Sequence, residues 1–573
     1  MRSTLIIASA CLWTALVVRA SPLGHSSSIQ SYPGPPGPEV DVGYSTYSGI
    51  ANKTTGLNTF KGIRYAAPPT GTLRWQAPKA PCINRSSNSI LDASTFGPVC
   101  PQSMFSTGPG TSNPGTIGDE DCLFLNVYAP ANATKLPVLV WIHGGGYGAG
   151  DGTQDLSAII NANNNSFVGV TIQYRLGAFG FLSSDEVLRK GVVNVGLLDQ
   201  HFALQWVQDK IHLFGGDQAR VTISGESAGA GSVMLHTMAY NGTLGTSLFS
   251  NSIAASPYLP MQYGYKDWQP SQAYYAFASQ AGCPASTAYG SSSQTIFDCL
   301  IAKDTTTLQK ASFNVSASGV YGTWAFVPVT DGTFVQQVPS QQLLSKQING
   351  NRTLTGNNAL EGYYFVPRTI TTKTALTQWI YLLFPLFTDN DVSKLLAAYN
   401  YTSDPQTIAD DIYGETTFTC PSYWLAEAFA QDGPAVYGRA GFKYQYSVPA
   451  ALHGADIPAY FGPATPNQGP DFVKAFMTIW GNFIVGTDPS IPNDPNSGAA
   501  RNWPLYTKEI PSMLNLNETG GLAFTTAIAG KNFTEYREPG LKNDITLVDA
   551  YDFYNGRGAR CEFWRGISAQ VPE

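Results

Sequence analysis

The segment RVTISGESAGAGSVML, residues 220–235, limits the fold of this chain more than any other stretch. Its β-branched start is typical of a buried strand, and its small-residue end is typical of a closely packed helix. Between them lies Ser227, with a glycine two residues away on each side. A strand that reverses at once into a helix places such a serine above a sheet, with a helix N-terminus behind it. With 57 glycines in 573 residues, the pattern G-x-S-x-G also arises by chance, so other features have to support this interpretation.

Three continuous apolar runs predict a parallel sheet. They cover residues 136–144, 167–174 and 220–225, and none alternates like a half-exposed strand. A helical pattern at 196–211 separates the second run from the third, so strand, helix and strand form a βαβ unit. The expected fold class is α/β, with a mostly parallel central sheet and helices on both faces. Two further regions rich in helical periodicity are expected to cover the carboxyl ends of the strands: 265–320 and 375–435.

The ends and the charge of the chain predict one secreted domain. Residues 1–20 have the positive start, the apolar core and the small-residue end of a cleavable signal peptide, and the alternative is a membrane anchor. Residues 21–40 are a lead-in rich in Pro, Ser and Gly, which leaves 41–573 as one α/β domain. No later apolar run is long enough to cross a membrane. A net charge of −7 argues against a nucleic-acid partner.

Cysteines and glycosylation sequons agree with secretion. The chain has eight cysteines, and loss of Cys11 with the signal peptide leaves seven, widely spaced and without a C-x-x-C pair. This spacing favours disulfides over zinc, and the odd number leaves one thiol over. Ten N-x-S/T sequons are candidate glycosylation sites: Asn52, Asn84, Asn132, Asn164, Asn241, Asn314, Asn351, Asn400, Asn517 and Asn532.

A glycine-rich segment, HGGGYGAG at 143–150, directly follows the first apolar run. Its three successive glycines leave backbone N–H groups unobstructed and allow the dihedrals that bring those groups to one point. Such a turn could instead bind phosphate, but its place upstream of G-x-S-x-G fits an oxyanion hole better. The predicted donors are the N–H groups of Gly145, Gly146 and Ala228.

A nucleophilic serine needs a base, and elimination among the six histidines points to His453. The other five lie in the lead-in, in the glycine-rich segment or in the helical segments around the serine: His25, His143, His201, His212 and His236. His453 follows a Tyr- and Phe-rich strand, in a loop near the C-terminal part of the chain. The chain order serine, acid, histidine requires that position.

The third member is a carboxylate between the serine and the histidine. In LTGNNALEGYYF, residues 354–365, a short polar turn presents Glu361 just before a glycine. From this pattern alone, Asp331 and Asp389 compete with it.

Many ordered segments together resemble the type-B carboxylesterase/lipase family, which includes the cholinesterases. The similarity covers nearly all of residues 45–565. It implies an α/β-hydrolase fold with helical insertions over an active-site gorge, and the cleavage of carboxylic esters by a serine nucleophile. The matching segments are FKGIRYAAPPTGTLRW, EDCLFLNVYAP, HGGGYGAG, NVGLLDQHFALQWVQDKIHLFGGD, GESAGAG, FVPVTDGTF, NNALEG, HGADIPAYFG, WPLY and CEFW.

The resemblance also implies roles for acidic residues. The family's acid falls on Glu361, although Leu360 stands where an acidic residue often precedes it. Glu226 and Asp456 match acids that steady the histidine and a buried water. The alternative for both is a local hydrogen bond to the loop.

Further positions follow from the same resemblance. Trp324 and Gly322 align with the acyl pocket, the alternative being a core tryptophan. Cys82 is left over from the family's disulfides, and its pairing with Cys100 stays open as an alternative. The three implied disulfides are Cys100–Cys122, Cys283–Cys299 and Cys420–Cys561.

The expected function is that of a secreted serine ester hydrolase that works through an acyl-enzyme on a small-molecule ester, without metal or cofactor. The loop 101–121 has no tryptophan to hold a choline group, and Met104, Phe105 and Ile117 are its only large apolar side chains. Such a loop cannot form an amphipathic lid helix, so we expect soluble esters of short to medium chain length. The alternatives are a lipase acting on triacylglycerol or sterol esters, and a non-catalytic adhesion or binding relative. The sequence does not determine the natural ester or the oligomeric state.

Overall fold

The structure, a computed structural model, describes residues 37–83, 90–108, 115–285, 294–430, 438–492 and 498–572. The expected signal peptide, most of the lead-in and the sequon at Asn84 lie outside the described residues. The described end of the lead-in already belongs to the fold, because strand β1 (Glu39–Asp41) pairs with β2 (Thr46–Ser48). These two strands form a small sheet with β5 (Ile90–Asp92).

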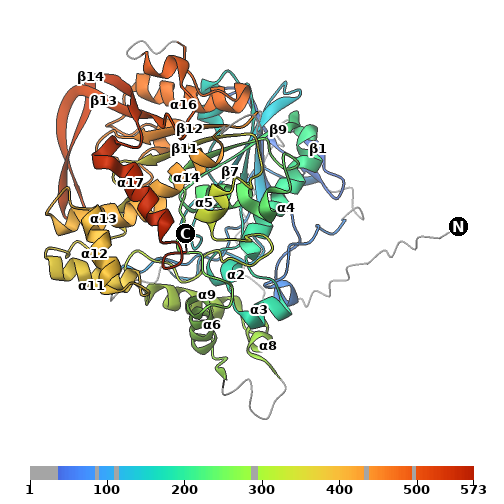
Figure 1. Cartoon of the computed structure of the whole chain (residues 1–573). Helices are drawn as coiled ribbons and strands as arrows, with labels where there is room; N and C mark the ends of the chain where they lie inside the picture. The colour runs from blue at the N-terminus through green and yellow to red at the C-terminus, as the bar shows by residue number, and fades with distance from the viewer. Residues whose placement is uncertain are drawn as a thin grey trace, which may run out of the picture.

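One eleven-stranded sheet runs through the molecule, in the order β14-β13-β12-β11-β10-β9-β7-β8-β6-β4-β3 (Figure 1). The neighbouring strands from β8 to β13 are parallel, while the pairs at the two ends of the sheet are antiparallel. The prediction of a mostly parallel sheet is therefore confirmed. Its strands are β3 (Ile50–Asn52), β4 (Leu57–Arg64), β6 (Phe124–Pro130), β7 (Leu136–Ile142), β8 (Val168–Ile172), β9 (Gly216–Glu226), β10 (Asn251–Ala255), β11 (Arg352–Asn358), β12 (Ala440–Tyr446), β13 (Ser512–Ile528) and β14 (Lys531–Asp549).

The three apolar runs of the sequence form β7, β8 and β9, and the helical pattern forms α4 (Val195–Lys210). One detail differs from a simple βαβ unit. Strands β8 and β9 are not neighbours, since β7 lies between them and pairs in parallel with both. The segment that ends in the glycine-rich turn is therefore next to the strand that ends in Ser227.

Helices cover both faces of the sheet. Alternate residues of β7 show this directly, since Val140 belongs to the core shared with α4 and α5, while Trp141 belongs to the core shared with α15 and α16. The ring of Trp141 meets that of Phe461 edge to face at 4.7 Å. The helices on and around the sheet include α1 (Ser157–Ala162), α2 (Gly177–Phe181), α3 (Asp185–Lys190), α5 (Ala228–Met238), α10 (Pro339–Leu344), α15 (Ile457–Phe461), α16 (Pro470–Gly486) and α17 (Phe553–Gly566).

The two expected insertions are helical. Most of their helices lie away from α16, while α14 lies at the centre of the molecule (Figure 1). Residues 265–320 contain α6 (Trp268–Gln280), α8 (Ile296–Ile301) and α9 (Thr305–Ala317). Residues 375–435 contain most of α11 (Lys373–Leu383), then α12 (Asp389–Ala398), α13 (Pro405–Gly414), a π-helical turn η5 (Glu415–Thr419) and α14 (Cys420–Ala428).

The described part of the chain has three disulfides. They are the pairs implied by the resemblance, and Cys82, which is exposed, belongs to none of them. The pair Cys420–Cys561 joins α14 to α17 across 141 residues of sequence. In the described part of the chain, no helix is both long and apolar enough to cross a membrane.

Candidate active site

Ser227 occupies the turn between β9 and α5 in a conformation that few residues adopt. Its φ is 55° and its ψ is −125°, and its N–H donates to the carbonyl O of Ala255 at 3.0 Å. The flanking glycines have steric reasons. A Cβ on Gly225 would lie 2.3 Å from the backbone of Gly229, and a Cβ on Gly229 would lie 2.0 Å from the carbonyl O of Ile142. A positive φ at a non-glycine residue stores strain that the surrounding packing must hold, and such strain is frequent at functional sites.

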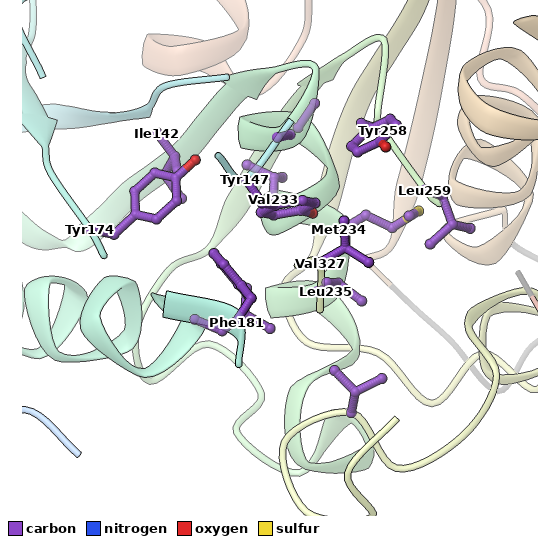
Figure 2. Close-up of a cluster of buried hydrophobic side chains, with 14 of the residues drawn as sticks. Ile142, Tyr147, Tyr174, Phe181, Val233, Met234, Leu235, Tyr258, Leu259 and Val327 are labelled. Carbon is purple, nitrogen blue, oxygen red and sulfur yellow. The ribbon is translucent and has the colours of Figure 1, made fainter. Parts of the chain in front are cut away.

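Helix α5 supplies that packing. All eleven of its residues are buried. Figure 2 shows Val233 of this helix in one apolar cluster with Tyr147, Phe181 and Tyr258. Ala228 is the first residue of α5, so its N–H has no partner within the helix and points, with the positive end of the helix dipole, toward the turn.

The glycine-rich turn follows β7 and adopts backbone conformations that favour glycine. Gly145 and Gly146 have φ values of +104° and +61°. The carbonyl O of Gly145 accepts from the N–H groups of Gly148 at 3.1 Å and Ala149 at 2.9 Å, which closes the turn. Among the described residues, the N–H groups of Gly145 and Gly146 have no acceptor. These amides are free to bind an anion.

His453 and Glu361 are in direct polar contact. Nδ1 of His453 lies 2.6 Å from Oε2 of Glu361. The other carboxylate oxygen of Glu361 accepts from Oγ of Ser256 at 2.6 Å and from the N–H of Asn358 at 2.5 Å. The acid is therefore fixed on both sides and holds the imidazole by one nitrogen.

The second ring nitrogen of His453, Nε2, is buried and has no hydrogen-bond partner in the described part of the chain. It lies 3.3 Å from Oε1 of Glu226, the residue directly before Ser227. Burial alone would lower the pKa of His453, but the carboxylates of Glu226 and Glu361 outweigh burial and raise it to about 9. Burial raises the pKa of Glu226 to about 8, against the opposing charge of His453. The two groups titrate as a coupled pair.

Asp456 is linked to Glu361 through a hydrogen-bond network. Its carboxylate accepts from Nδ2 of Asn358 at 3.1 Å and from the hydroxyl of Tyr444 at 3.4 Å. Burial raises its pKa to about 6. Asp456 and Glu361 thus share Asn358 as a hydrogen-bond donor.

The two competing acids serve other purposes. Asp331 accepts from the N–H groups of three residues that follow it, and so closes its own turn. Asp389 begins α12 and accepts from the hydroxyl of Tyr381. Of the three candidate acids, only Glu361 contacts His453.

A cavity of about 330 Å³ lies beside the site. It includes Trp324, whose indole lies so close to the glycine-rich turn that a Cβ on Gly146 would be 1.9 Å from Nε1. No side chain with a carboxylate, ammonium or guanidinium group is among the described residues that line it. Gly322 is not in this lining. Its carbonyl O accepts from the hydroxyl of Tyr413 at 2.6 Å. In the described residues, no group of three or more His, Cys, Asp or Glu side chains is arranged to hold a metal ion.

Three aromatic side chains near the site were not singled out as site residues from the sequence. The ring of Phe418 lies 4.2 Å from that of His453, and the ring of Phe365 lies 5.2 Å from it. Phe105 meets both Trp324 and Phe365, at 5.7 and 5.9 Å. The sequence did offer a sign for Phe105, because it is one of the few large apolar side chains of the loop 101–121. The described parts of that loop contain no helix.

The structure separates the nine sequons within the described residues. The side chain of Asn517 is half-buried, and its Oδ1 is buried without a hydrogen-bond partner among the described residues. Asn241 is half-buried. The exposed asparagines are Asn52, Asn132, Asn164, Asn314, Asn351, Asn400 and Asn532.

Comparisons with known proteins agree with this geometry. The sequence model of the Carboxylesterase family matches residues 36–532. An acetylcholinesterase from Bungarus fasciatus is 30% identical over 502 residues, 80% of this chain and 79% of that protein. Carboxylesterase patB from Aspergillus clavatus is 29% identical over 520 residues, 80% of this chain and 89% of that protein. The crystal structure of Aspergillus niger EstA superposes with a TM-score of 0.75 at 27% identity, covering 94% of this chain and 99% of that one.

The family match extends over most of the chain, and another solved structure of the same fold, titled PNB esterase, superposes with a TM-score of 0.66 at 26% identity, covering 88% of this chain and 97% of that one. The site has a serine at a strained strand-to-helix turn and a histidine held by a buried carboxylate. The chain belongs to the carboxylesterase family, and it is a serine carboxylic ester hydrolase.

Proposed function

We propose that this protein cleaves esters through an acyl-enzyme formed on Ser227. The observation that carries the proposal is the orientation of His453: Nδ1 is held by Glu361, while Nε2 is left without a hydrogen-bond partner beside the serine turn. In its neutral form, His453 accepts the hydroxyl proton as Ser227 attacks the ester carbonyl. Glu361 keeps the imidazole in place and offsets the charge that it gains.

The glycine-rich turn and α5 supply the second half of the mechanism. The N–H groups of Gly145, Gly146 and Ala228 bind the oxyanion of the tetrahedral intermediate. His453 then protonates the leaving alcohol. Water repeats the cycle on the acyl-enzyme and releases the acid.

The cavity supports a neutral substrate. Its lining has no charged side chain to pair with an acidic substrate, and the loop 101–121 has no tryptophan for a quaternary ammonium. We propose soluble esters with short to medium acyl chains. Trp324, between the oxyanion turn and the cavity, is the proposed residue that limits acyl length. Gly322, outside the lining, acts only by placing the segment that carries Trp324.

One observation favours a lipase as the second candidate. Two residues of the cavity lining are exposed apolar side chains, Trp268 at 46% and Leu382 at 64%. Leu386, close by in the sequence, is 47% exposed. Such a rim could contact a lipid surface.

The rate of tributyrin hydrolysis across the solubility limit separates the two candidates. A soluble-ester hydrolase already works on monomeric tributyrin and shows no jump when an emulsion forms. A sharp rise at emulsion formation, with little hydrolysis below it, would establish the lipase instead. A 4-nitrophenyl butyrate assay with and without an organophosphate tests the serine mechanism in the same preparation, because an inhibitor that leaves the rate intact contradicts it.

We also propose that the mature chain is secreted and glycosylated, with residues 41–573 as one catalytic domain. Disulfides in the structure support an oxidising compartment. Glycans are expected on exposed sequons and not on Asn517, whose side chain is half-buried with its Oδ1 buried. Peptide mapping after glycosidase treatment in labelled water, which marks each formerly glycosylated asparagine, tests this assignment.

A further inference from the structure

The hairpin of β13 and β14 is much longer than its place in the sheet requires. Only Tyr444–Tyr446 of β12 pair with β13, and they pair with residues 514–516. Beyond that point the hairpin leaves the sheet and curves toward α13 (Figure 1). Its register shifts between Gly520 and Leu522. Three glycines with φ between +78° and +102° lie at this shift, and such a bulge bends a hairpin. We call residues 521–540 the distal hairpin.

One face of the distal hairpin packs against the body of the protein. Phe533 is 9% exposed and forms a small apolar cluster with Tyr363, Ala450 and Leu452. The rings of Phe533 and Tyr363 meet edge to face at 5.2 Å, and the hydroxyl of Tyr363 donates to the carbonyl O of Ile528 at 2.9 Å.

A buried carboxylate adds a polar anchor on the same face. Glu535 is 8% exposed, and its Oε1 accepts from the N–H of Ala450 at 3.2 Å and from Nδ2 of Asn467 at 2.9 Å. Its Oε2 accepts from the hydroxyl of Thr526 on the opposite strand. Hydrogen bonds to a charged acceptor are stronger than neutral ones, so this residue ties the hairpin firmly to the loop before His453.

The residues that the hairpin contacts are neighbours of the acid and the histidine. Leu360 and Leu452 form an isolated parallel bridge, and the N–H of Leu360 donates to the carbonyl O of Ala451 at 2.9 Å. Glu361 and His453 directly follow the two bridged residues. Leu360 and Leu452 both belong to the Phe533 cluster. The bridge therefore sets the spacing of the 2.6 Å contact, and the hairpin packs on the bridge.

We propose that the distal hairpin is a positioning element for the acid–histidine pair, with Phe533 and Glu535 as its positioning residues. Neither side chain touches the reacting atoms. They act by holding the loops of Leu360 and Leu452 at the separation that lets Glu361 orient His453. The proposal rests on the proposed catalytic roles of those two residues.

The test compares two truncations on the same strand. Phe533→Ala removes the aromatic ring from the inward face, and Tyr536→Ala removes one from the outward face, where Tyr536 is 41% exposed. With a soluble ester, Phe533→Ala is expected to lower kcat about tenfold with little change in KM, since a small displacement of a catalytic group is costly. The pH dependence of kcat/KM is expected to shift as well, because the carboxylate of Glu361 supports the charged form of His453.

Two further variants separate positioning from simple destabilisation. Phe533→Leu keeps an apolar side chain in the cluster and is expected to recover most of the rate. Glu535→Gln keeps the shape but removes the charge, and is expected to lower kcat about threefold, a smaller loss than that of the ring, with KM kept. Thermal unfolding of every variant is followed in parallel, and rates are measured well below the unfolding temperature.

Three outcomes would overturn the proposal: equal rates for Phe533→Ala and wild type, equal losses for Phe533→Ala and Tyr536→Ala, or a loss confined to KM. Failure of the proposed function would give different experimental results. In that case the wild-type protein itself would hydrolyse no ester, or would keep its full rate after Ser227→Ala.

Discussion

The two halves of the active site are built by different means. The serine half consists of Ser227, which follows β9, and the glycine-rich turn, which follows β7; these two strands are parallel neighbours. Its geometry is fixed by hard contacts, such as the 2.0 Å that would separate a Cβ on Gly229 from the backbone of Ile142. The acid–histidine half consists of two loops after β11 and β12, and Glu361 and His453 are 92 positions apart in the sequence. Its geometry depends on a backbone bridge and on a hairpin from a third region of the chain.

Because of this difference, we expect the two halves of the active site to respond differently to substitutions. A steric arrangement fails abruptly, because an added atom cannot be accommodated without moving backbone. An arrangement held by side-chain packing fails by degrees, because each contact contributes only part of the position. We therefore expect atoms added in the serine half to cause steep losses of activity, and substitutions that remove packing around the acid–histidine half to cause smaller ones. Loss of a reacting group itself is severe in either half.

The largest effects should come from the reacting groups. Ser227→Ala is expected to remove nearly all turnover and leave the fold intact. Glu361→Gln keeps the shape of the acid but weakens its hold on the imidazole. Losses of about 10³-fold or more in kcat are expected for either variant. Steady-state rates with 4-nitrophenyl butyrate, alongside circular dichroism to confirm folding, give the comparison.

Asp331→Asn is the matched control for the acid. Asp331 also accepts hydrogen bonds from backbone N–H groups, but it is only half-buried and closes its own turn. Its amide variant is expected to keep most of the rate. A near-normal rate for Glu361→Gln together with a large loss for Asp331→Asn would mean that the acid has been assigned to the wrong residue.

The next largest effect is expected from Gly146→Ala. The new Cβ would lie 1.9 Å from Nε1 of Trp324, so either the indole or the oxyanion turn has to move. Misplacing one donor of an oxyanion hole costs about 10²-fold in kcat. Gly332→Ala is the matched control, because Gly332 has a similar φ of +73° and no atom within 4 Å of its Cβ position. If both variants keep full activity, Gly146 does not belong to the oxyanion hole.

The contrast between the halves also explains what the sequence could predict. The serine turn, its two strands and the oxyanion glycines are encoded in short contiguous segments whose residue types have local steric causes. For the acid, residue patterns alone left Asp331 and Asp389 open, because its role depends on which loop reaches His453 in space. The extent of the β13–β14 hairpin and its contacts with Tyr363 and Ala450 could not be predicted, since no local pattern encodes contacts between residues that are 165 and 85 positions apart.

A smaller effect, which tests how the two halves interact, is expected from Glu226→Gln. Glu226 belongs to the serine half, and its carboxylate raises the pKa of His453 in the other half. Removing this negative charge makes the imidazolium less favourable, so His453 becomes a neutral base at lower pH. The rising limb of the pH profile of kcat/KM should move to lower pH by about one pH unit.

The shift applies to the free enzyme and is measured with an uncharged ester, so that the substrate does not titrate. Glu518→Gln is the control, since Glu518 is also a buried carboxylate with a pKa raised to about 7, but it binds the N–H of Gly469 outside the site. A profile that stays in place for Glu226→Gln, or that moves equally for Glu518→Gln, would remove Glu226 from the titration of His453.

The smallest effect is expected at the border between the serine half and the cavity. Trp324 packs on Gly146 and also on Gly148, where a Cβ would lie 2.2 Å from its ring. Trp324→Ala opens space on the cavity side without removing a donor, so acetate and butyrate esters should lose only a few-fold in kcat/KM. Longer esters should gain, because each added methylene that becomes buried contributes about 0.8 kcal/mol, or roughly fourfold. The preference, measured as kcat/KM from acetate to decanoate, should therefore shift toward longer chains. An unchanged chain-length profile would mean that Trp324 supports the oxyanion turn and does not limit the acyl group.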